Sequence, residues 1–353
     1  MGAEVVCSLI FLITAHAVPS VAEISCRNEL GQAVDWFAMY KLPRVMEHQS
    51  AGLGLRYMYL DPWTADWQQG KYLVNTTESA VGRTLQQLYA NNQSKVNDHA
   101  YFIYNDAPPS MPYDMFHGHT KGVLMFDKIQ GFWLTHSVPH FPPNVTDGYA
   151  WPSSGRRNGQ TLLCVTIKYD QVTKIGDQFL YSNPHVYSWT LPHRFLPELS
   201  KLQIVSKGGS TAKSPWKRHT KLTSLGGVQF QSFAKYKLFG DDIYTAWAAQ
   251  LLDTDLLAET WNIGKYQLPS NCSLHRYVYN VVKVQLPGPA SFPSTHDHSK
   301  WCVSLQPSDG WACVGDLNRA EGQMWRSGGL LCTQNPLLYK AFRQSVSLYR
   351  NCS

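Results

Sequence analysis

The feature that most constrains the fold of this chain is an internal duplication of strand and helix patterns. In the first half, an apolar run over 33–43 precedes a helical pattern over 79–92 and a strand pattern over 100–106. The second half has a strand pattern over 227–236, a helical pattern over 240–261 and another strand pattern over 276–286. This order predicts an α/β fold with mixed sheets, built as a pseudo-dimer of two similar halves within one chain.

The limits of the two halves follow from this pattern and from the amino terminus. Residues 1–22 contain an apolar run and end in small residues, which predicts a signal peptide cleaved near Ala22. We then expect one half over 23–205 and the other over 206–353. The simpler interpretation is a coincidental likeness between generic strand and helix units, and the sequence leaves both open.

Each half carries a His-x-His-x-Lys pattern directly before a predicted hairpin, over 122–137 and over 301–318. Side chains two apart on a strand lie on the same face, so each segment presents a row of basic groups. If the halves pack as predicted, His119 and Lys121 face His298 and Lys300 across a cleft. The two patterns consist of His117, His119, Lys121, His296, His298 and Lys300.

A third His-x-Lys triplet, His219 to Lys221, shows that the triplet alone is weak evidence. Several basic residues surround it and no hairpin pattern follows it, so we expect a solvated basic loop there. The hairpin, and not the triplet, therefore distinguishes the two functional candidates.

Two imidazoles and two ammonium groups around one phosphodiester can cleave it without a metal ion. The lysines stabilise the charge that develops at phosphorus. One histidine attacks to form a phosphohistidine, while the other protonates the departing oxygen and then activates water. We favour His119 as the nucleophile and His298 as the acid, although the sequence does not decide this order. Mildly acidic pH makes both protonation states accessible.

A metal site is the competing interpretation, because His-x-His on a strand is also a zinc-ligand spacing. No Glu-x-x-His pattern or carboxylate cluster completes a ligand set, and Asp127 and Asp297 are candidates only by proximity. We therefore expect no metal and no cofactor, with His117 and His296 at the rim of the site.

Several features predict passage through the secretory pathway to the lysosome or the cell exterior. Removal of the signal leaves seven cysteines and no Cys-x-x-Cys pair, so disulfides with one free thiol are expected. No later stretch is apolar for long enough to span a membrane, so we expect no membrane insertion. Glycosylation sequons begin at Asn75, Asn92, Asn144, Asn271 and Asn351.

The charge of the predicted mature chain suits an anionic substrate in an acidic compartment. Loss of Glu4 leaves 31 basic and 24 acidic side chains, a net charge of +7, and 12 histidines add positive charge as the pH falls. Many secreted proteins of similar charge bind no polyanion, so charge alone does not assign a substrate.

A series of sequence segments, in the order in which they occur along the chain, resembles the deoxyribonuclease II family over nearly the whole mature sequence. The resemblance rests on "AVDWFAMYKLP", "YNDAPP", "GHTKGVL", "GFWLTHSVPHFPP", "QSFAKYKLFGDDIYTAW", "DHSKWCV" and "CVGDLNR". Smaller details such as "ISCRNE" and "GRRNGQ" are closer to the beta type than to the alpha type. The resemblance implies a metal-independent acid endonuclease on a phospholipase D-like fold, which cleaves double-stranded DNA to 3′-phosphate and 5′-hydroxyl ends.

The resemblance also implies roles for particular residues. The two His-x-Lys motifs map onto the four catalytic candidates His119, Lys121, His298 and Lys300. Phospholipase D proper has a motif aspartate that Asp127 misses by one residue, which puts a catalytic role for Asp127 in doubt. The residues expected to support the site are His136, Asp316 and Asn318. The implied disulfides are Cys26 to Cys164, Cys272 to Cys352 and Cys313 to Cys332, with Cys302 left as a buried thiol.

Contacts to the DNA backbone supply most sequence-independent affinity, and basic side chains supply the contacts. The candidates are Lys41, Lys235, Arg156 and Arg157, for each of which ordinary surface solubility is the alternative. Two other functions also stay open from the sequence: hydrolysis of another phosphodiester, such as a phospholipid headgroup, and a catalytically silent polyanion-binding glycoprotein. The sequence is compatible with a homodimer and does not determine the oligomeric state.

Overall fold

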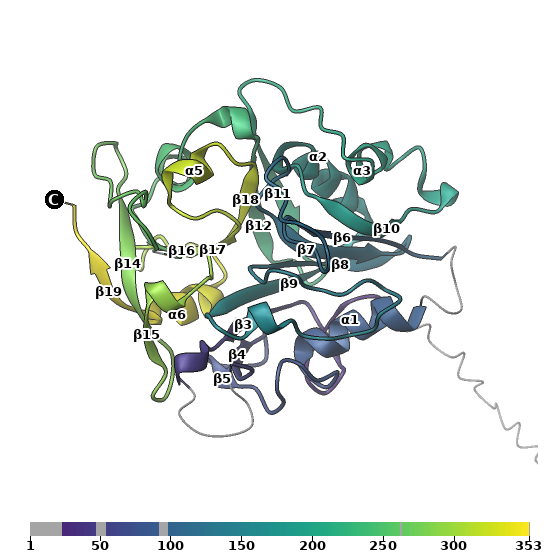
Figure 1. Cartoon of the computed structure of the whole chain (residues 1–353), viewed down its shortest axis with the longest axis horizontal. Helices are drawn as coiled ribbons and strands as arrows, with labels where there is room; N and C mark the ends of the chain where they lie inside the picture. The colour runs from purple at the N-terminus through teal and green to yellow at the C-terminus, as the bar shows by residue number, and fades with distance from the viewer. Residues whose placement is uncertain (1–22, 47–53, 92–97, 262, 353) are drawn as a thin grey trace, which may run out of the picture.

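Two large β-sheets form the framework of the computed structural model, which describes residues 23–46, 54–91, 98–261 and 263–352 (Figure 1). The first sheet is antiparallel throughout, in the order β10-β6-β7-β8-β9-β3-β4-β5. Its strands are β3 (Trp36–Lys41), β4 (Tyr57–Leu60), β5 (Gln68–Gln69), β6 (Ala100–Asn105), β7 (Lys121–Phe126), β8 (Gln130–His136), β9 (Gln160–Lys168) and β10 (Val186–Thr190).

The second sheet comes from the carboxyl-terminal part of the chain, in the order β11-β12-β18-β17-β16-β13-β14-β15, with β19 also paired to β14. The pair β13 and β14 is parallel. Its strands are β11 (Lys217–Thr223), β12 (Gln229–Lys235), β13 (Leu256–Glu259), β14 (Val278–Gln285), β15 (Ser291–Pro293), β16 (Trp301–Ser304), β17 (Ala312–Gly315), β18 (Gly328–Thr333) and β19 (Val346–Arg350). A small ribbon pairs β1 (Cys26–Arg27) with β2 (Ala33–Val34).

Short helices cover the faces of the sheets. In Figure 1, α1 lies on one face of the first sheet, and α2 and α3 lie on the other. The α-helices are α1 (Ala80–Asn91), α2 (Val172–Ser182), α3 (Ser200–Ser206), α4 (Ala249–Leu252), α5 (Glu321–Met324) and α6 (Pro336–Gln344). A π-helical turn, Tyr244–Ala248, leads directly into α4.

The two sheets share a strand order around the predicted hairpins. The series β6-β7-β8-β9-β3 in the first sheet corresponds to β13-β16-β17-β18-β12 in the second. This confirms the mixed α/β fold class and both hairpins, while the pseudo-two-fold relation and the boundary between the halves stay predictions. The sequence pattern was wrong about one partner, because it matched β6 with β14 and not with β13.

The error came from the segment 240–261, which we expected to be helical to its end. Asp253 adopts a left-handed conformation, with φ of 53°, and ends the helix there. The following apolar run then forms β13, which is buried because its side chains enter hydrophobic clusters on both faces of the sheet. A short buried strand has no alternating pattern, so periodicity does not separate it from a helix.

The triplet at His219 was also predicted wrongly as a loop. It lies on β11, an edge strand that is four strands away from β16 in the sheet order. His219 Nε2 lies 2.6 Å from Gln231 Oε1 on β12. Basic side chains on an edge strand discourage pairing with another chain, so the pattern fits an edge as well as a loop. The prediction that no hairpin follows this triplet was wrong as well, because β11 pairs antiparallel with β12, the next strand along the chain.

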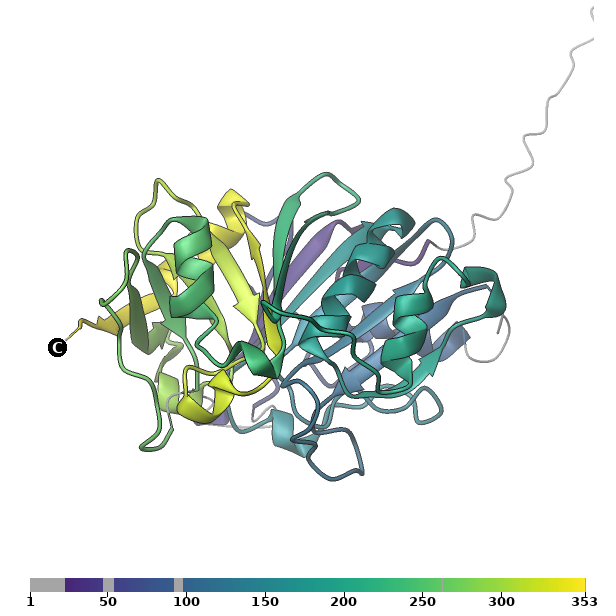
Figure 2. The same cartoon turned by 90° about the horizontal axis from the view of Figure 1, so that it is seen from above.

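A single hydrophobic core joins the two halves, which lie side by side in Figure 2. The ring of Tyr40 on β3 lies 6.5 Å from that of Trp301 on β16, and its hydroxyl accepts a hydrogen bond from Trp301 Nε1 at 3.0 Å. Gln178 on α2 donates to the Ser232 carbonyl of β12 at 2.8 Å. Each aromatic pair contributes about 1 kcal/mol beyond its buried area, so these contacts hold the sheets in a defined relative position.

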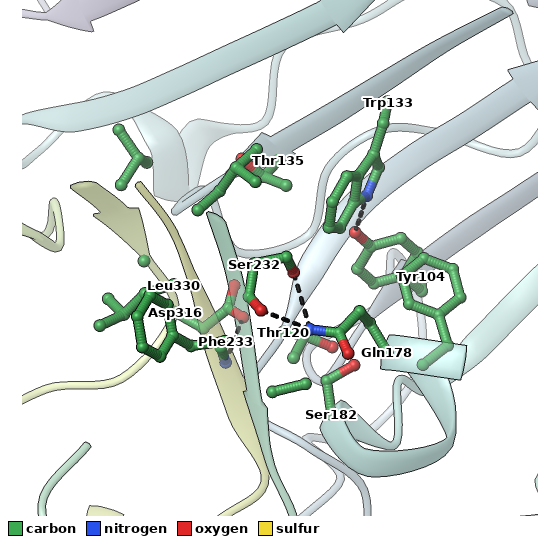
Figure 3. A pocket seen from close by; sticks show the side chains of 16 residues that line it. Tyr104, Thr120, Trp133, Thr135, Gln178, Ser182, Ser232, Phe233, Asp316 and Leu330 are labelled. Atoms are coloured by element: carbon green, nitrogen blue, oxygen red, sulfur yellow. Dashed lines mark hydrogen bonds between the residues drawn. The ribbon is translucent and has the colours of Figure 1, made fainter. Parts of the chain in front are cut away.

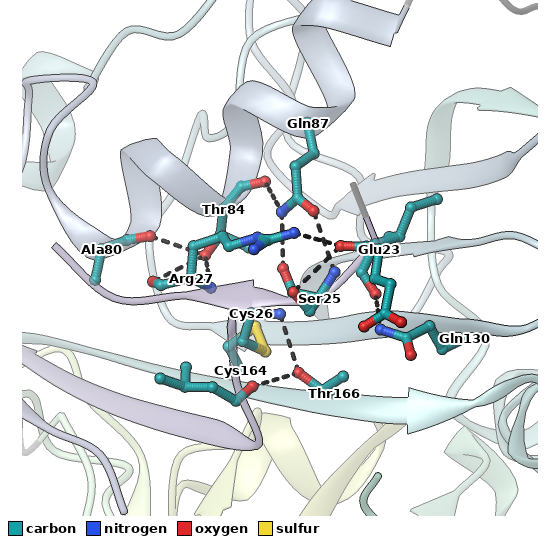
Figure 4. The surroundings of a disulfide bond; sticks show 12 residues. Glu23, Ser25, Cys26, Arg27, Ala80, Thr84, Gln87, Gln130, Cys164 and Thr166 are labelled. Carbon is teal, nitrogen blue, oxygen red and sulfur yellow. Dashed lines mark hydrogen bonds between the residues drawn. A yellow bond between two sulfur atoms is a disulfide. The ribbon is translucent and has the colours of Figure 1, made fainter. Parts of the chain in front are cut away.

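The three disulfides implied by the family resemblance are present: Cys26 to Cys164, Cys272 to Cys352 and Cys313 to Cys332. The first ties β1 to β9, and Thr166 beside it accepts a hydrogen bond from the Cys26 amide at 3.0 Å (Figure 4). Cys302 is buried and free, and burial raises the pKa of its thiol. Cys302 is therefore an inert core residue, as expected.

The secretory features are only partly covered by the described residues. The predicted signal peptide and the sequon at Asn92 lie outside them. Of the other sequon asparagines, Asn75 and Asn351 are exposed, and Asn144 and Asn271 are half-buried. Glycosylation stays a prediction. Among the described residues, no helix has the length and apolar character needed to cross a membrane.

Candidate active site

The two His-x-Lys motifs lie directly before the corresponding strands β7 and β16, and only Lys121 is itself a strand residue. The row of basic side chains on one strand face, which the sequence suggested, is therefore not formed. The backbone amide of His119 donates to the Ser327 carbonyl at 2.8 Å, just before β18. The amide of His298 donates to the Gly159 carbonyl at 2.9 Å, just before β9. Each catalytic segment is therefore held by the loop that leads into a strand of the opposite half.

The imidazoles repeat this reciprocal arrangement. His119 Nδ1 lies 2.7 Å from the carbonyl oxygen of Asp316, directly after β17. His298 Nδ1 lies 2.9 Å from the carbonyl oxygen of Ser137, directly after β8. A carbonyl only accepts, so each Nδ1 carries the proton and donates it. This fixes the tautomer in which Nε2 of each neutral ring holds the reactive lone pair.

A buried carboxylate that the sequence pattern missed organises the first motif. Asp106, directly after β6, accepts a hydrogen bond from Lys121 Nζ and lies 3.3 Å from Arg326 Nη2 and 3.8 Å from His119 Nε2. Burial opposes ionisation of Asp106, but the charges of Lys121, His119 and Arg326 outweigh it and lower the pKa of the carboxyl. The only sequence signal for Asp106 was its place at the end of the strand in "YNDAPP".

The four candidates lie close enough for their charges to affect one another's pKa values. Burial and then Lys121 lower the pKa of His119 to about 3, and Lys300 also contributes. Burial, Lys300, Lys121 and His119 together hold the pKa of His298 well below its usual value. Burial and Lys121 likewise lower the pKa of Lys300, whose Nζ donates to the His298 carbonyl. Such a cationic cluster favours the binding of an anion, because a bound phosphate would offset the repulsion.

The three expected supporting residues lie around this cluster in different roles. His136 ends β8; its Nδ1 accepts from the Val138 amide at 3.2 Å, and burial followed by Lys121 lowers its pKa to about 3. Asp316 Oδ2 accepts from the Gly329 amide at 2.9 Å, and burial raises the pKa of this carboxyl to about 7.

Asn318 acts through a residue that the sequence analysis missed. Its Oδ1 accepts from the Trp261 amide at 3.2 Å. The Trp261 ring packs edge-on against His298, with ring centroids 4.8 Å apart and planes at 70°. Asn318 therefore positions the Trp261 ring, which in turn packs against His298.

A cavity of about 30 Å³ lies between the two halves, beside Asp316 (Figure 3). Its lining includes three polar atoms without a hydrogen-bond partner among the described residues: Thr120 Oγ1, Thr135 Oγ1 and Gln178 Oε1. The volume suits one or two water molecules and is far too small for a nucleotide. The cavity therefore belongs to the support of the site and not to substrate binding.

Two of the expected DNA contacts need correction. Lys41 and Lys235 are both buried. Lys41 Nζ donates to the Arg156 carbonyl at 3.0 Å, and Lys235 Nζ donates to the Met324 carbonyl at 2.6 Å. Both lysines end core strands, so they are covered and hold the loops before β9 and β18. These are the same loops whose carbonyls accept the His298 and His119 amides.

The other expected DNA contacts, Arg156 and Arg157, are exposed on the loop that precedes Gly159. Their position is compatible with contacts to a polyanion at the site, and these contacts stay predictions. Asp127 accepts hydrogen bonds from Ile129 and Gln130 amides within the β7–β8 turn, which agrees with the doubt about its catalytic role.

Comparisons with known proteins identify the family of this chain. The Deoxyribonuclease II family model matches residues 25–352. Human deoxyribonuclease-2-beta is 47% identical, with 98% of this chain and 96% of that protein covered. Mouse deoxyribonuclease-2-alpha is 44% identical, with 95% of each chain covered, and plancitoxin-1 of Acanthaster planci is 38% identical, with 97% and 96% covered. The chain therefore belongs to the deoxyribonuclease II family, whose members hydrolyse the phosphodiester bonds of DNA.

Proposed function

We propose that this protein is a metal-independent acid endodeoxyribonuclease that cleaves double-stranded DNA through a phosphohistidine. The observation that carries the proposal is the reciprocal fixing of His119 and His298 by backbone carbonyls of the opposite half. Both reactive Nε2 atoms are thereby set in one tautomer beside two lysines. A nucleophile, an acid and charge stabilisation are then present without a cofactor.

The two histidines differ in one respect that assigns their roles. Asp106 Oδ2 lies 3.8 Å from His119 Nε2 and favours the imidazolium form of that ring. Among the described residues, His298 has no carboxylate within ion-pair distance. We therefore assign the acid to His119 and the nucleophile to His298, the reverse of the order favoured from the sequence.

The proposed reaction has two steps. Nε2 of His298 attacks phosphorus, and the bond from phosphorus to the 5′ oxygen breaks as His119 donates its proton to that oxygen. This leaves a 5′-hydroxyl end and a 3′-phosphoryl group on His298. Neutral His119 then takes a proton from water, whose oxygen displaces His298 and leaves a 3′-phosphate end.

Acid dependence follows from the cationic surroundings of the site. One imidazole must be protonated, yet burial and the two lysines hold the pKa of both below the ordinary value near 6.5. A bound phosphate offsets the lysine charges, and acidic pH supplies the remaining driving force. A lysosomal or extracellular location and glycosylation at the sequons fit this chemistry and belong to the same proposal. The expectation that the chain does not insert into a membrane is also part of it.

The cleavage experiment uses plasmid DNA at pH 5 in excess EDTA. The wild type and His219→Ala, a triplet histidine outside the site, should nick the plasmid and leave 3′ ends that a polymerase extends only after phosphatase treatment. His119→Ala and His298→Ala should lose at least about 10³-fold of the rate. An intact plasmid with the wild-type enzyme, or full activity in either site variant, would refute the proposal.

The assignment of His298 as the nucleophile and His119 as the acid is tested with a p-nitrophenyl phosphodiester. Its leaving group departs without protonation by an acid. With this substrate His119→Ala should still release p-nitrophenol in a burst and accumulate phosphohistidine at position 298, identified by mass spectrometry after an alkaline quench. His298→Ala should release none. A burst from His298→Ala with phosphate on His119 would restore the order favoured from the sequence.

A further inference from the structure

Three potential metal ligands converge outside the catalytic cluster. His117 Nδ1 lies 2.6 Å and His185 Nδ1 lies 3.2 Å from the same oxygen, Oδ2 of Asp114. The two imidazole rings lie next to each other, with centroids 5.0 Å apart. The donor atoms of all three side chains lie within 4.8 Å of one another.

The two oxygens of the Asp114 carboxylate have different partners. Asp114 Oδ1 accepts hydrogen bonds from the Phe116 amide at 2.7 Å and the His117 amide at 3.3 Å, which leaves Oδ2 directed at the imidazoles. Ligating carboxylates are commonly held by hydrogen bonds of this kind, because the bonds orient the ligand atom in advance.

The nitrogen of His185 is an independent pointer to a ligand. Its Nδ1 is buried and lies 3.2 Å from Asp114 Oδ2, within ion-pair distance, but no hydrogen bond to it is formed among the described residues. The residue is anchored by its backbone carbonyl, which accepts from the Asn105 amide of β6 at 3.0 Å. A buried imidazole nitrogen without a hydrogen-bond partner is a cost that a bound cation would remove.

We propose that Asp114, His117 and His185 bind one divalent transition-metal ion, with Zn²⁺ as the ion that best fits two imidazoles and one carboxylate. Three protein ligands leave a fourth position of a tetrahedral site for water. Calcium and magnesium prefer oxygen ligands, so they fit this donor set poorly. Each side chain is between 16% and 22% exposed, so an ion can reach the site from solvent.

The ion would fasten an irregular loop to the first sheet. Asp114 and His117 belong to the segment that connects β6 to β7, whereas His185 directly precedes β10. Arg326 from the second half donates to the carbonyls of Asp114 and His117 and lies 3.3 Å from Asp106 Oδ2. Metal binding at this loop is therefore a structural cross-link near the catalytic cluster, and no step of the proposed reaction passes through the ion.

Untagged, chelator-treated protein at pH 7 tests the site with Co²⁺ and Zn²⁺. We expect one Co²⁺ per chain with visible d–d absorption, and a rise in melting temperature with Zn²⁺. His185→Ala and Asp114→Asn should lose both signals; the second variant keeps an acceptor oxygen for the loop amides. His275→Ala is the matched control, because His275 lies 3.6 Å from Asp253 in an exposed pair that lacks a second imidazole.

The outcomes separate a metal site from a hydrogen-bonded cluster. Stoichiometric Co²⁺ binding that both variants lose and the control keeps supports the site. Absence of binding in the wild type, or equal binding in His185→Ala, refutes it and leaves Asp114 as a carboxylate bridging two imidazoles. DNA cleavage in EDTA is measured on the same samples, so a failure of the proposed nuclease activity is recognised separately.

Discussion

Replacement of Asp106 by Asn is the sharpest test of how the site is held together. The change keeps the size of the side chain and one acceptor oxygen but removes a buried negative charge. That charge accepts a hydrogen bond from Lys121 and lies within 3.3 Å of Arg326 and 3.8 Å of His119. The variant therefore leaves a cationic cluster without its buried counter-ion.

The expected loss in the free energy of unfolding depends on which hydrogen bonds Arg326 and Lys121 keep in the variant. Removal of one partner from a buried ion pair costs about 3–5 kcal/mol. Arg326 keeps its bond to the Tyr113 hydroxyl at 2.6 Å and its bonds to the His117 carbonyl, whereas Lys121 loses its charged partner. We therefore take the lower end, a loss of about 3 kcal/mol in the free energy of unfolding. For a chain of this size, that corresponds to a fall of about 4 °C in melting temperature.

The dependence on pH has a definite sign. The pKa of Asp106 is lower in the folded protein than its unfolded value near 3.9, so its ionised form stabilises the fold above that pH. The stabilisation is lost only as the pH falls below about 4 toward the folded pKa. The difference between wild type and Asp106→Asn should therefore be equal at pH 7 and pH 5 and shrink at pH 3. The enzyme keeps this contribution at the acidic pH where it is proposed to work.

Thermal unfolding of both proteins at pH 7, 5 and 3 measures this difference. The control is Asp98→Asn, because Asp98 and its partner Arg194 are 61% and 42% exposed and such pairs contribute less than about 1 kcal/mol. A fall of less than 2 °C for Asp106→Asn at pH 5 would refute the reasoning. A difference that grows below pH 4 would refute the assigned pKa direction.

Further predictions concern DNA binding and proton transfer. Replacing Arg156 and Arg157 together by Ala should reduce the slope of log affinity against log salt by about 1.8, measured by fluorescence anisotropy, if each contacts one phosphate. Lys41→Met should lower the melting temperature and leave that slope unchanged, because its ammonium is buried on loop carbonyls; a change in slope would show that Lys41 contacts DNA. Burial and nearby lysines lower the pKa of His298, so Lys121→Met should raise it in an NMR titration; an unchanged value would contradict the shared site.

Local pattern alone predicted the strands that follow the catalytic candidates. The hairpins after Lys121 and Lys300 were recognisable because strand alternation and turn residues act over a few positions. The same reasoning failed at 240–261, because β13 is buried on both faces of the sheet and therefore lacks the alternating pattern of a strand with one exposed face. It also placed Lys41 and Lys235 at the surface, because charge in the sequence does not report what covers a strand end.

Sequence by itself thus determined the fold class, the hairpin that follows each His-x-Lys motif and, through family resemblance, the disulfide pairs. Only the tertiary structure decided which groups complete the site. Arg326 reaches Asp106, and Trp261 reaches His298, from segments far away in the chain, and short-range pattern carries no information on such contacts. The reciprocal carbonyl bonds to His119 and His298 likewise exist only when the two sheets are packed together, because each joins one half of the chain to the other.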